Sequence, residues 1–299
     1  MDFFPNVRRS YLVNEIYAID PESPKTIDQL ALMALMFGFT EGRFIADFPD
    51  GWENKLISHF EKNNLIFSNG PQRLKLINFL EKFKEATLQP RKINYRLTKG
   101  WLENALDNSN FHQFQAIICD NKETSSKCIS IEDALYYDKL IDSRSCVVES
   151  NQQRYLDLLY PLLIKSTELY FQDVNLKLFY GIDTRYSAKK FIELLFYKIK
   201  ETKRCNKITF IFGEENYPDL KTRKKLEEEI KNMVIDHGPS YLSFQIKYSS
   251  KKESHERYAF SIKAGIRFGY GFDTPSRAKN TISWMSKSEL TNLLNHHNI

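Results

Sequence analysis

The stretch HERYAFSIKAGIRFGYGFD, residues 255–273, is the most informative part of this chain. It predicts a strand that opens with His-x-Arg, a tight turn at Ala264-Gly265, a second strand and a Gly-x-Gly-Phe-Asp terminus. Two short strands joined by a glycine-containing turn form a hairpin. We therefore expect a hairpin whose first strand begins at His255 and carries Arg257.

Helices and strands alternate on the N-terminal side of this hairpin. Lys207–Phe212 is almost entirely apolar, which is typical of a strand buried in a parallel sheet. Ser150 with Gln153 and Ser286 with Glu289 have the spacing of capping boxes, and a further helix is expected to start near Asp219 or Thr222. The order predicts an α/β domain with a mostly parallel sheet over residues 145–299.

The first half is less regular. Apolar spacing predicts a buried helix over 27–37, further helices from Trp52 and Trp101, and a strand over 113–119. Residues 1–140 are therefore expected to form a smaller α/β or α+β domain, separated from the second by a polar break between about 120 and 150. The two tryptophans are interpreted as core anchors. Three aspartates near prolines fit turns better than metal ligands: Asp20, Asp47 and Asp50.

Charge is distributed unevenly over the 299 residues. Residues 151–299 hold 25 Lys and Arg against 17 Asp and Glu, whereas the first half holds 18 against 21. This asymmetry favours an anionic partner, nucleic acid or a lipid surface, for the second half. A merely solvated basic surface would give the same difference, so the alternative stays open.

Other features restrict the class of protein. The four cysteines are far apart and form no zinc-binding set, which predicts reduced thiols and a cytoplasmic location. The start of the chain lacks the order of a signal peptide, and the run Leu30–Phe37 is too short to span a bilayer. No motif predicts a cofactor or a metal. His296-His297 is expected to be a frayed tail.

The second half resembles the phospholipase D-like superfamily. The likeness is to its single-half, non-catalytic form at the C-terminus of proteins with a microtubule-interacting-and-transport domain, and to relatives associated with bacterial defence. It depends on a strand ending Phe171-Gln172-Asp173, on His255-Glu256-Arg257, on the turn at Ala264-Gly265, and on Gly269–Asp273. The first half lacks the three-helix pattern of the microtubule-interacting-and-transport domain.

The resemblance implies phosphate recognition. In catalytic members two His-x-Lys motifs meet, one histidine attacking phosphorus and the other protonating the leaving oxygen. Here Arg257 stands at the lysine position and Ile262 at the position of an aspartate. A single His255 supplies no acid–base pair within one chain, so catalysis would require a homodimer. Arginine can still bind phosphate through two parallel hydrogen bonds.

The predicted phosphate-binding residues are His255, Arg257, Lys251, Lys252 and Arg267, with Asp273 orienting Arg257. The glycines of the hairpin are interpreted as turn and close-packing positions. Lys198, Lys200, Lys203, Arg204 and Lys207, with Arg277 and Lys279, are candidates for an adjoining basic surface.

Three functions follow as hypotheses. The first is a non-catalytic, pseudoenzyme-like module that binds nucleic acid and uses its N-terminal domain as an adaptor for a protein partner, in a protein complex for antiviral defence or DNA processing. The second is a dimeric, metal-independent nuclease or phosphodiesterase that uses His255. The third is a peripheral module that binds anionic lipid, although the membrane is the less favoured partner.

Overall fold

The computed structural model describes residues 14–299 except 64, 66–69, 90–93, 110–113, 121–124, 126, 136–144, 150, 179–181, 251–255 and 273–278, with the backbone alone described at 135, 149 and 182–187. Within this range the chain forms two compact units, residues 14–144 and 145–299. Both combine helices with a sheet, so the predicted α/β class is confirmed.

The N-terminal unit is built on an open parallel sheet. Its strands are β1 (Glu15–Ile19), β2 (Arg43–Ala46), β3 (Thr87–Leu88), β4 (Ala116–Ile118) and β5 (Cys128–Ile129). They lie in the order β3-β2-β1-β4-β5, and every pairing is parallel. The central strand is therefore β1, with β2 on one side and β4 on the other.

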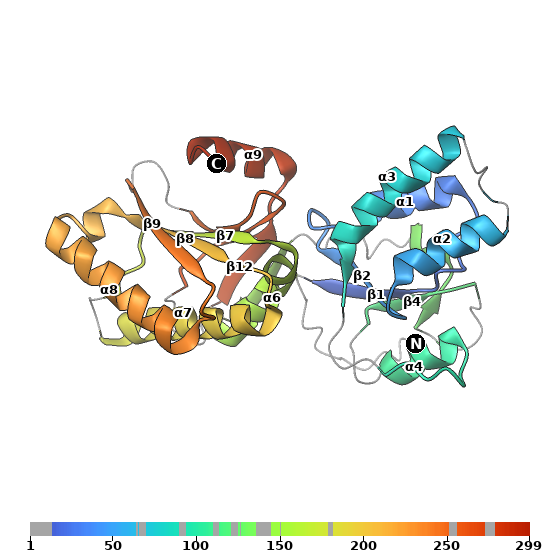
Figure 1. The fold of residues 1–299 in the computed structure, drawn as a ribbon, viewed down its shortest axis with the longest axis horizontal. Helices are drawn as coiled ribbons and strands as arrows, with labels where there is room; N and C mark the ends of the chain where they lie inside the picture. Colours follow the sequence, from blue (N-terminus) through green and yellow to red (C-terminus); the bar gives the residue numbers. More distant parts are fainter. Residues whose placement is uncertain are drawn as a thin grey trace, which may run out of the picture. The chain divides into compact units, whose positions relative to one another are not determined.

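Helices cover both faces of this sheet (Figure 1). They are α1 (Ile27–Met36), α2 (Trp52–Lys62), α3 (Pro71–Ala86), α4 (Trp101–Ser109) and α5 (Ile131–Leu135). Side chains alternate along a strand, so Tyr17 and Ile19 of β1 pack against α1, α2, α3 and α5. Ala18 points to the other face, where Ala105 of α4 packs. Trp52 is fully buried and donates from Nε1 to the carbonyl of Ile19, 2.6 Å away.

The C-terminal unit is built on a mixed sheet. Its strands are β6 (Ser145–Glu149), β7 (Glu168–Asp173), β8 (Lys207–Gly213), β9 (Ser243–Ser249), β10 (Arg257–Phe260), β11 (Gly265–Phe268) and β12 (Lys279–Trp284). The order is β6-β12-β11-β10-β7-β8-β9. Only β7, β8 and β9 pair in parallel. The other four pairings are antiparallel.

The expectation of a mostly parallel sheet is therefore wrong for the C-terminal unit and describes the N-terminal one instead. A parallel pair needs a crossover of about a dozen residues or more. The helices α6 (Gln152–Lys165), α7 (Ile182–Thr202) and α8 (Leu220–His237) provide such crossovers up to β9. From β9 onward the connections between successive strands are short. The strands β10, β11 and β12 therefore pair antiparallel with their neighbours.

The two faces of the C-terminal sheet have separate cores. On one face Phe171 lies against Phe191 of α7, with ring centroids 6.2 Å apart, and α6, α7 and α8 pack side by side (Figure 1). On the other face α9 (Lys287–His296) packs through Leu290 and Leu293 against Tyr170 and Phe260.

Helix caps follow the sequence closely. The capping box of α9 is present as predicted, and Asp219 caps α8 by accepting from the N–H of Thr222. The predicted cap Ser150 lies outside the described residues, and Asn151 caps α6 instead.

The C-terminal histidines are not a frayed tail. His297 Nε2 lies 2.6 Å from Oε1 of the buried Gln172, and its ring stacks on Phe260 at 6.1 Å between centroids. This contact fixes the end of α9 against β7.

Candidate anion-binding site at the end of strand β7

The candidate site forms where β7 ends and β10 begins. These strands pair antiparallel with Asp173 opposite Arg257, so the end of one and the start of the other meet at the same edge of the sheet. β11 pairs with the far side of β10 and ends at this edge too, which brings the turn after Phe268 to the same place. The end of β7 and the β10–β11 hairpin, which is remote from it in sequence, thus converge on one pair of charged side chains.

Asp173 is buried and held by three groups. Its Oδ1 accepts from the N–H of Asn175 at 3.0 Å, and its Oδ2 accepts from the N–H of Phe272 at 3.2 Å. Arg257 Nε lies 3.7 Å from Oδ1. A buried carboxylate is tolerated only with such partners, so Asp173 holds the end of β7 to the turn after β11.

Asp173 is not the only group that Arg257 contacts, and part of its guanidinium group remains exposed. Its Nη1 donates to the carbonyl of Gly269 at 3.3 Å, and its Nε is buried without a hydrogen bond within the described residues. The side chain is 23% exposed, against 1% for that of Asp173. One edge of the guanidinium is therefore fixed by the protein while part of the group remains accessible to solvent.

The turn that Arg257 contacts is held from behind by Asn280. This fully buried amide accepts from the N–H of Tyr270 at 2.9 Å and donates to the Tyr270 carbonyl at 3.2 Å and to the Tyr155 hydroxyl at 2.8 Å. A Cβ on Gly269 would come within 3.2 Å of the Thr281 carbonyl oxygen. At Gly269 the absence of a side chain therefore allows close packing.

The structure does not bring all the predicted phosphate-binding residues together. His255, Lys251, Lys252 and Asp273 lie outside the described residues. Arg257 is opposite Phe268 and Tyr258 is opposite Arg267, so the two arginines point to opposite faces of the hairpin. Arg267 lies on the face covered by α9, 3.6 Å from Glu289.

The position of Ile262 and the carboxylate beside Arg257 can also be located. Ile262 is exposed in the turn between β10 and β11, at the other end of the hairpin from Arg257. The carboxylate beside Arg257 is instead Asp173. The sequence carried one signal for this pairing, the position of Asp173 at the end of an apolar strand.

The predicted basic surface is partly neutralised. Lys198 pairs with Glu201 at 2.7 Å, and Lys207 pairs with Glu168 at 3.3 Å. The residues that the structure describes contain no cluster of His, Cys, Asp and Glu suited to a metal ion. No helix among them is long and apolar enough to cross a bilayer.

Comparisons with known proteins do not assign this chain to a family. No protein-family model and no curated protein matches this chain. One solved structure that matches is polyphosphate kinase from Porphyromonas gingivalis, at 11% identity and a TM-score of 0.31, over 74% of this chain and 35% of that one. This chain thus spans about a third of that kinase.

A second match is TrmBL2, an archaeal chromatin protein described as showing a novel mode of DNA binding. It has 11% identity and a TM-score of 0.25, over 82% of this chain and 78% of that one. TM-scores this low carry no argument about either the fold or the function.

Proposed function

We propose that the protein is a non-catalytic component that binds phosphate groups of nucleic acid through its C-terminal, phospholipase D-like unit. The observation that supports this proposal most directly is the environment of the Arg257 side chain. Its guanidinium is oriented by a buried carboxylate and a backbone carbonyl yet remains partly exposed. An arginine held in this way is preorganised to donate to a phosphate oxygen.

The net positive charge of residues 151–299 supports the same proposal, since phosphate contacts dominate the affinity of proteins for nucleic acid. The chain contains one His-x-Arg motif and no second one. A single motif favours binding over phosphodiester cleavage, because the cleavage chemistry uses two histidines.

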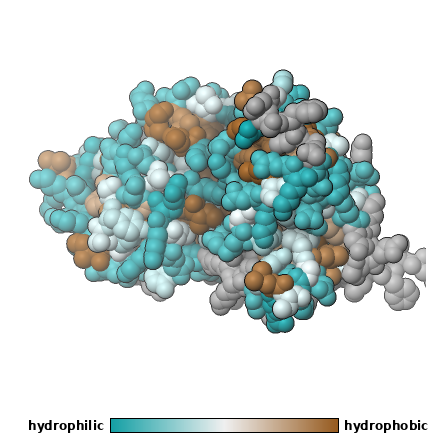
Figure 2. All heavy atoms as spheres, turned by 45° about the vertical axis from the view of Figure 1, so that its right-hand side comes forward, coloured by the Kyte–Doolittle hydropathy of each residue, from teal (hydrophilic) through white to brown (hydrophobic). Residues whose placement is uncertain are grey.

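We further propose that the N-terminal unit contacts a protein partner within a multi-protein defence or DNA-processing system. Apolar side chains support this role: Leu32 and Leu35 on α1, and Leu74 and Ile77 on α3, are exposed. Figure 2 shows several apolar patches on an otherwise mostly hydrophilic surface. The defence setting depends on the family resemblance alone.

The test compares two arginines on neighbouring strands. Binding of labelled single-stranded DNA and RNA is measured by fluorescence anisotropy in EDTA over a series of salt concentrations. Arg257→Gln is expected to weaken binding about tenfold and to reduce the slope of log K against log salt by about one. Arg267→Gln makes the same charge change on the opposite face and is the matched control.

Equal losses in the two variants would contradict a site at Arg257, and so would an absence of binding at low salt. Thermal unfolding of the Arg257→Gln variant checks that its weaker binding does not result from a loss of folded protein. Cleavage in EDTA that disappears in His255→Ala would favour the dimeric phosphodiesterase. Binding to anionic vesicles, without binding to nucleic acid, would favour the lipid-binding module.

A further inference from the structure

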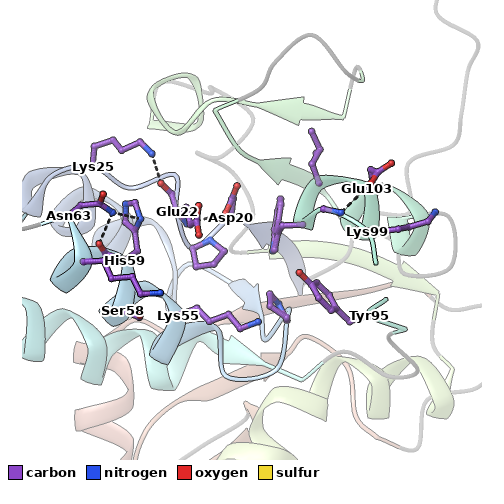
Figure 3. A pocket seen from close by; sticks show the side chains of 16 residues that line it. Asp20, Glu22, Lys25, Lys55, Ser58, His59, Asn63, Tyr95, Lys99 and Glu103 are labelled. Carbon is purple, nitrogen blue, oxygen red and sulfur yellow. Dashed lines mark hydrogen bonds between the residues drawn. The ribbon is translucent and has the colours of Figure 1, made fainter. Parts of the chain in front are cut away.

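A cavity of about 940 Å³ lies at the carboxyl edge of the parallel sheet in the N-terminal unit (Figure 3). Asp20 and Glu22, which follow β1, and Pro49, which follows β2, line it. Pro21 and Lys25 also lie between β1 and α1. The other lining residues come from α2 and Asn63 after it, from the segment that leads into α4, and from the first turn of α4. This volume falls within the range of about 300–1,000 Å³ that is common for small-molecule sites.

The position of the cavity follows from the topology. From β1 the chain passes through α1 on one face of the sheet to reach β2, whereas α4, on the other face, leads to β4. β2 and β4 flank β1 on opposite sides. Connections that diverge in this way leave a crevice above the central strand, and open α/β sheets bind their ligands at this point.

One wall of the cavity is a polar stripe along α2. Lys55, Ser58, His59 and Lys62 follow the i, i+3, i+4, i+7 spacing of one helix face, and all four line the cavity. The buried face of the same helix carries Trp52, Leu56 and Phe60.

The lysines of this stripe lack carboxylate partners. Within the described residues no Asp or Glu forms an ion pair with Lys55 or Lys62. In contrast, Lys25 pairs with Asp120 at 3.1 Å and Lys99 with Asp107 at 2.7 Å. The cationic charge of the stripe is therefore available to an anionic ligand.

The opposite wall is aromatic and firmly held. Tyr95 and Trp101 line it. Buried amides of α4 anchor the preceding segment: Asn104 donates to the carbonyls of Arg96, Lys99 and Gly100, and Asn108 donates to that of Asn94. Lys55 extends toward Tyr95, with Nζ 5.3 Å from the ring centroid (Figure 3). This wall offers aromatic rings against which a planar group can pack.

The floor is a partly buried carboxylate. Burial raises the pKa of Asp20, and the charges of Glu22 and Asp120 add to this, while the N–H of Glu22 and the charge of Lys25 oppose it. Asp20 Oδ1 accepts from that N–H at 3.0 Å. A carboxylate at such a position is suited to accept a hydrogen bond from a ligand hydroxyl.

We propose that this cavity binds a nucleotide. Its phosphates lie against Lys55 and Lys62, its base packs on Tyr95 and Trp101, and a sugar hydroxyl donates to Asp20. An anion without a ring would use only the α2 stripe, whereas a nucleotide uses the stripe, the aromatic wall and the floor. The nucleotide is either free or the end of a polynucleotide strand. The proposal is independent of the function proposed for the C-terminal unit.

Isothermal titration calorimetry in EDTA tests the proposal with the full chain. The probes are ATP, GTP, CTP and UTP, inorganic triphosphate, adenosine, and a 5′-phosphorylated single-stranded hexanucleotide. At least one mononucleotide, or the hexanucleotide, is expected to bind about tenfold more tightly than triphosphate or adenosine. Preference for the mononucleotide identifies a free ligand, and preference for the hexanucleotide identifies a strand end.

Variants locate the binding. Lys55→Gln with Lys62→Gln, and separately Tyr95→Leu, are each expected to weaken it about tenfold. Lys84→Gln removes an exposed lysine of α3 outside the cavity and is the matched control, and Arg257→Gln excludes a contribution from the C-terminal unit. Binding lost equally in Lys84→Gln, triphosphate bound as tightly as any nucleotide, or no binding at millimolar concentration would overturn the proposal.

Discussion

At the scale of single residues, two aspartates that follow parallel strands have opposite environments. Asp173, at the end of β7, receives two backbone N–H groups and faces an arginine. Asp20, directly after β1, has one backbone donor and lies near two other carboxylates. The first is satisfied by the protein and has a structural role. For the second, burial and the neighbouring carboxylates raise the pKa, so its ionised form is expected to oppose folding, as residues kept for a ligand often do.

Replacing Asp20 by Asn is therefore expected to stabilise the N-terminal unit at neutral pH by about 1 kcal/mol. Because its pKa in the folded protein is raised above 3.8, the ionised carboxylate reduces the free energy of unfolding at neutral pH. That penalty disappears as the pH falls through the raised pKa toward 3.8. Urea unfolding at neutral pH and near pH 4 should show a gain only at the higher pH.

Asp107→Asn is the control for this measurement. The hydrogen bond from Lys99 lowers the pKa of Asp107, so ionisation of this group favours the folded state, and its replacement should bring no gain at neutral pH. A loss of stability in Asp20→Asn at neutral pH would contradict the argument.

At the scale of elements, the loops after β7 and β8 are packed in direct contact. A Cβ on Gly213, the last residue of β8, would lie 2.2 Å from the carbonyl oxygen of Val174. The same carbonyl accepts from Nδ2 of the buried Asn216 at 2.8 Å. This approach fixes the loop that follows Asp173, so the candidate site depends on a glycine in the neighbouring strand.

We expect Gly213→Ala to destabilise the C-terminal unit by more than about 2 kcal/mol, because backbone atoms must move to admit the methyl group. Gly265→Ala is the comparison. Its Cβ would approach the Met285 sulfur at 2.5 Å, and a flexible side chain can move away. Denaturant unfolding of both variants should show the larger loss for Gly213→Ala, and the reverse order would contradict the packing argument.

At the scale of the whole molecule, the chain holds two units with separate hydrophobic cores. In the N-terminal unit one cluster packs β1 against α1, α2, α3 and α5, and a second lies on the face covered by α4. In the C-terminal unit a cluster lies between α9 and the sheet. Separate cores favour separate unfolding transitions.

Scanning calorimetry is therefore expected to resolve two transitions. Gly213→Ala should lower the midpoint of one, and Asp20→Asn should raise the midpoint of the other at neutral pH. A single transition that moves with both substitutions would show that the units unfold cooperatively. A ligand that binds one unit should raise the midpoint of that unit's transition, so the shifted transition identifies the unit that binds it.

Local patterns predicted much of the fold and little of the candidate site. The helix starts at Asp219 and Ser286 and the buried face of α2 follow from spacing and capping, which are properties of neighbouring residues. His297 appeared to be a tail because its partner, Gln172, is remote in sequence. Asp20 forms a turn as predicted, since its Oδ1 accepts from the N–H of Glu22, but nothing near it in the sequence indicates the cavity that it lines.

The α/β class and most of the elements follow from local sequence patterns, because hydrophobic periodicity and caps act over a few residues. The strand order does not follow from such patterns and is seen only in the folded chain. Strand pairing and register depend on contacts between distant segments, so the structure alone places Asp173 beside Arg257 and sends Arg267 to the opposite face. For the same reason the parallel sheet, with the cavity above its central strand, emerged in the half of the chain whose sequence indicated least.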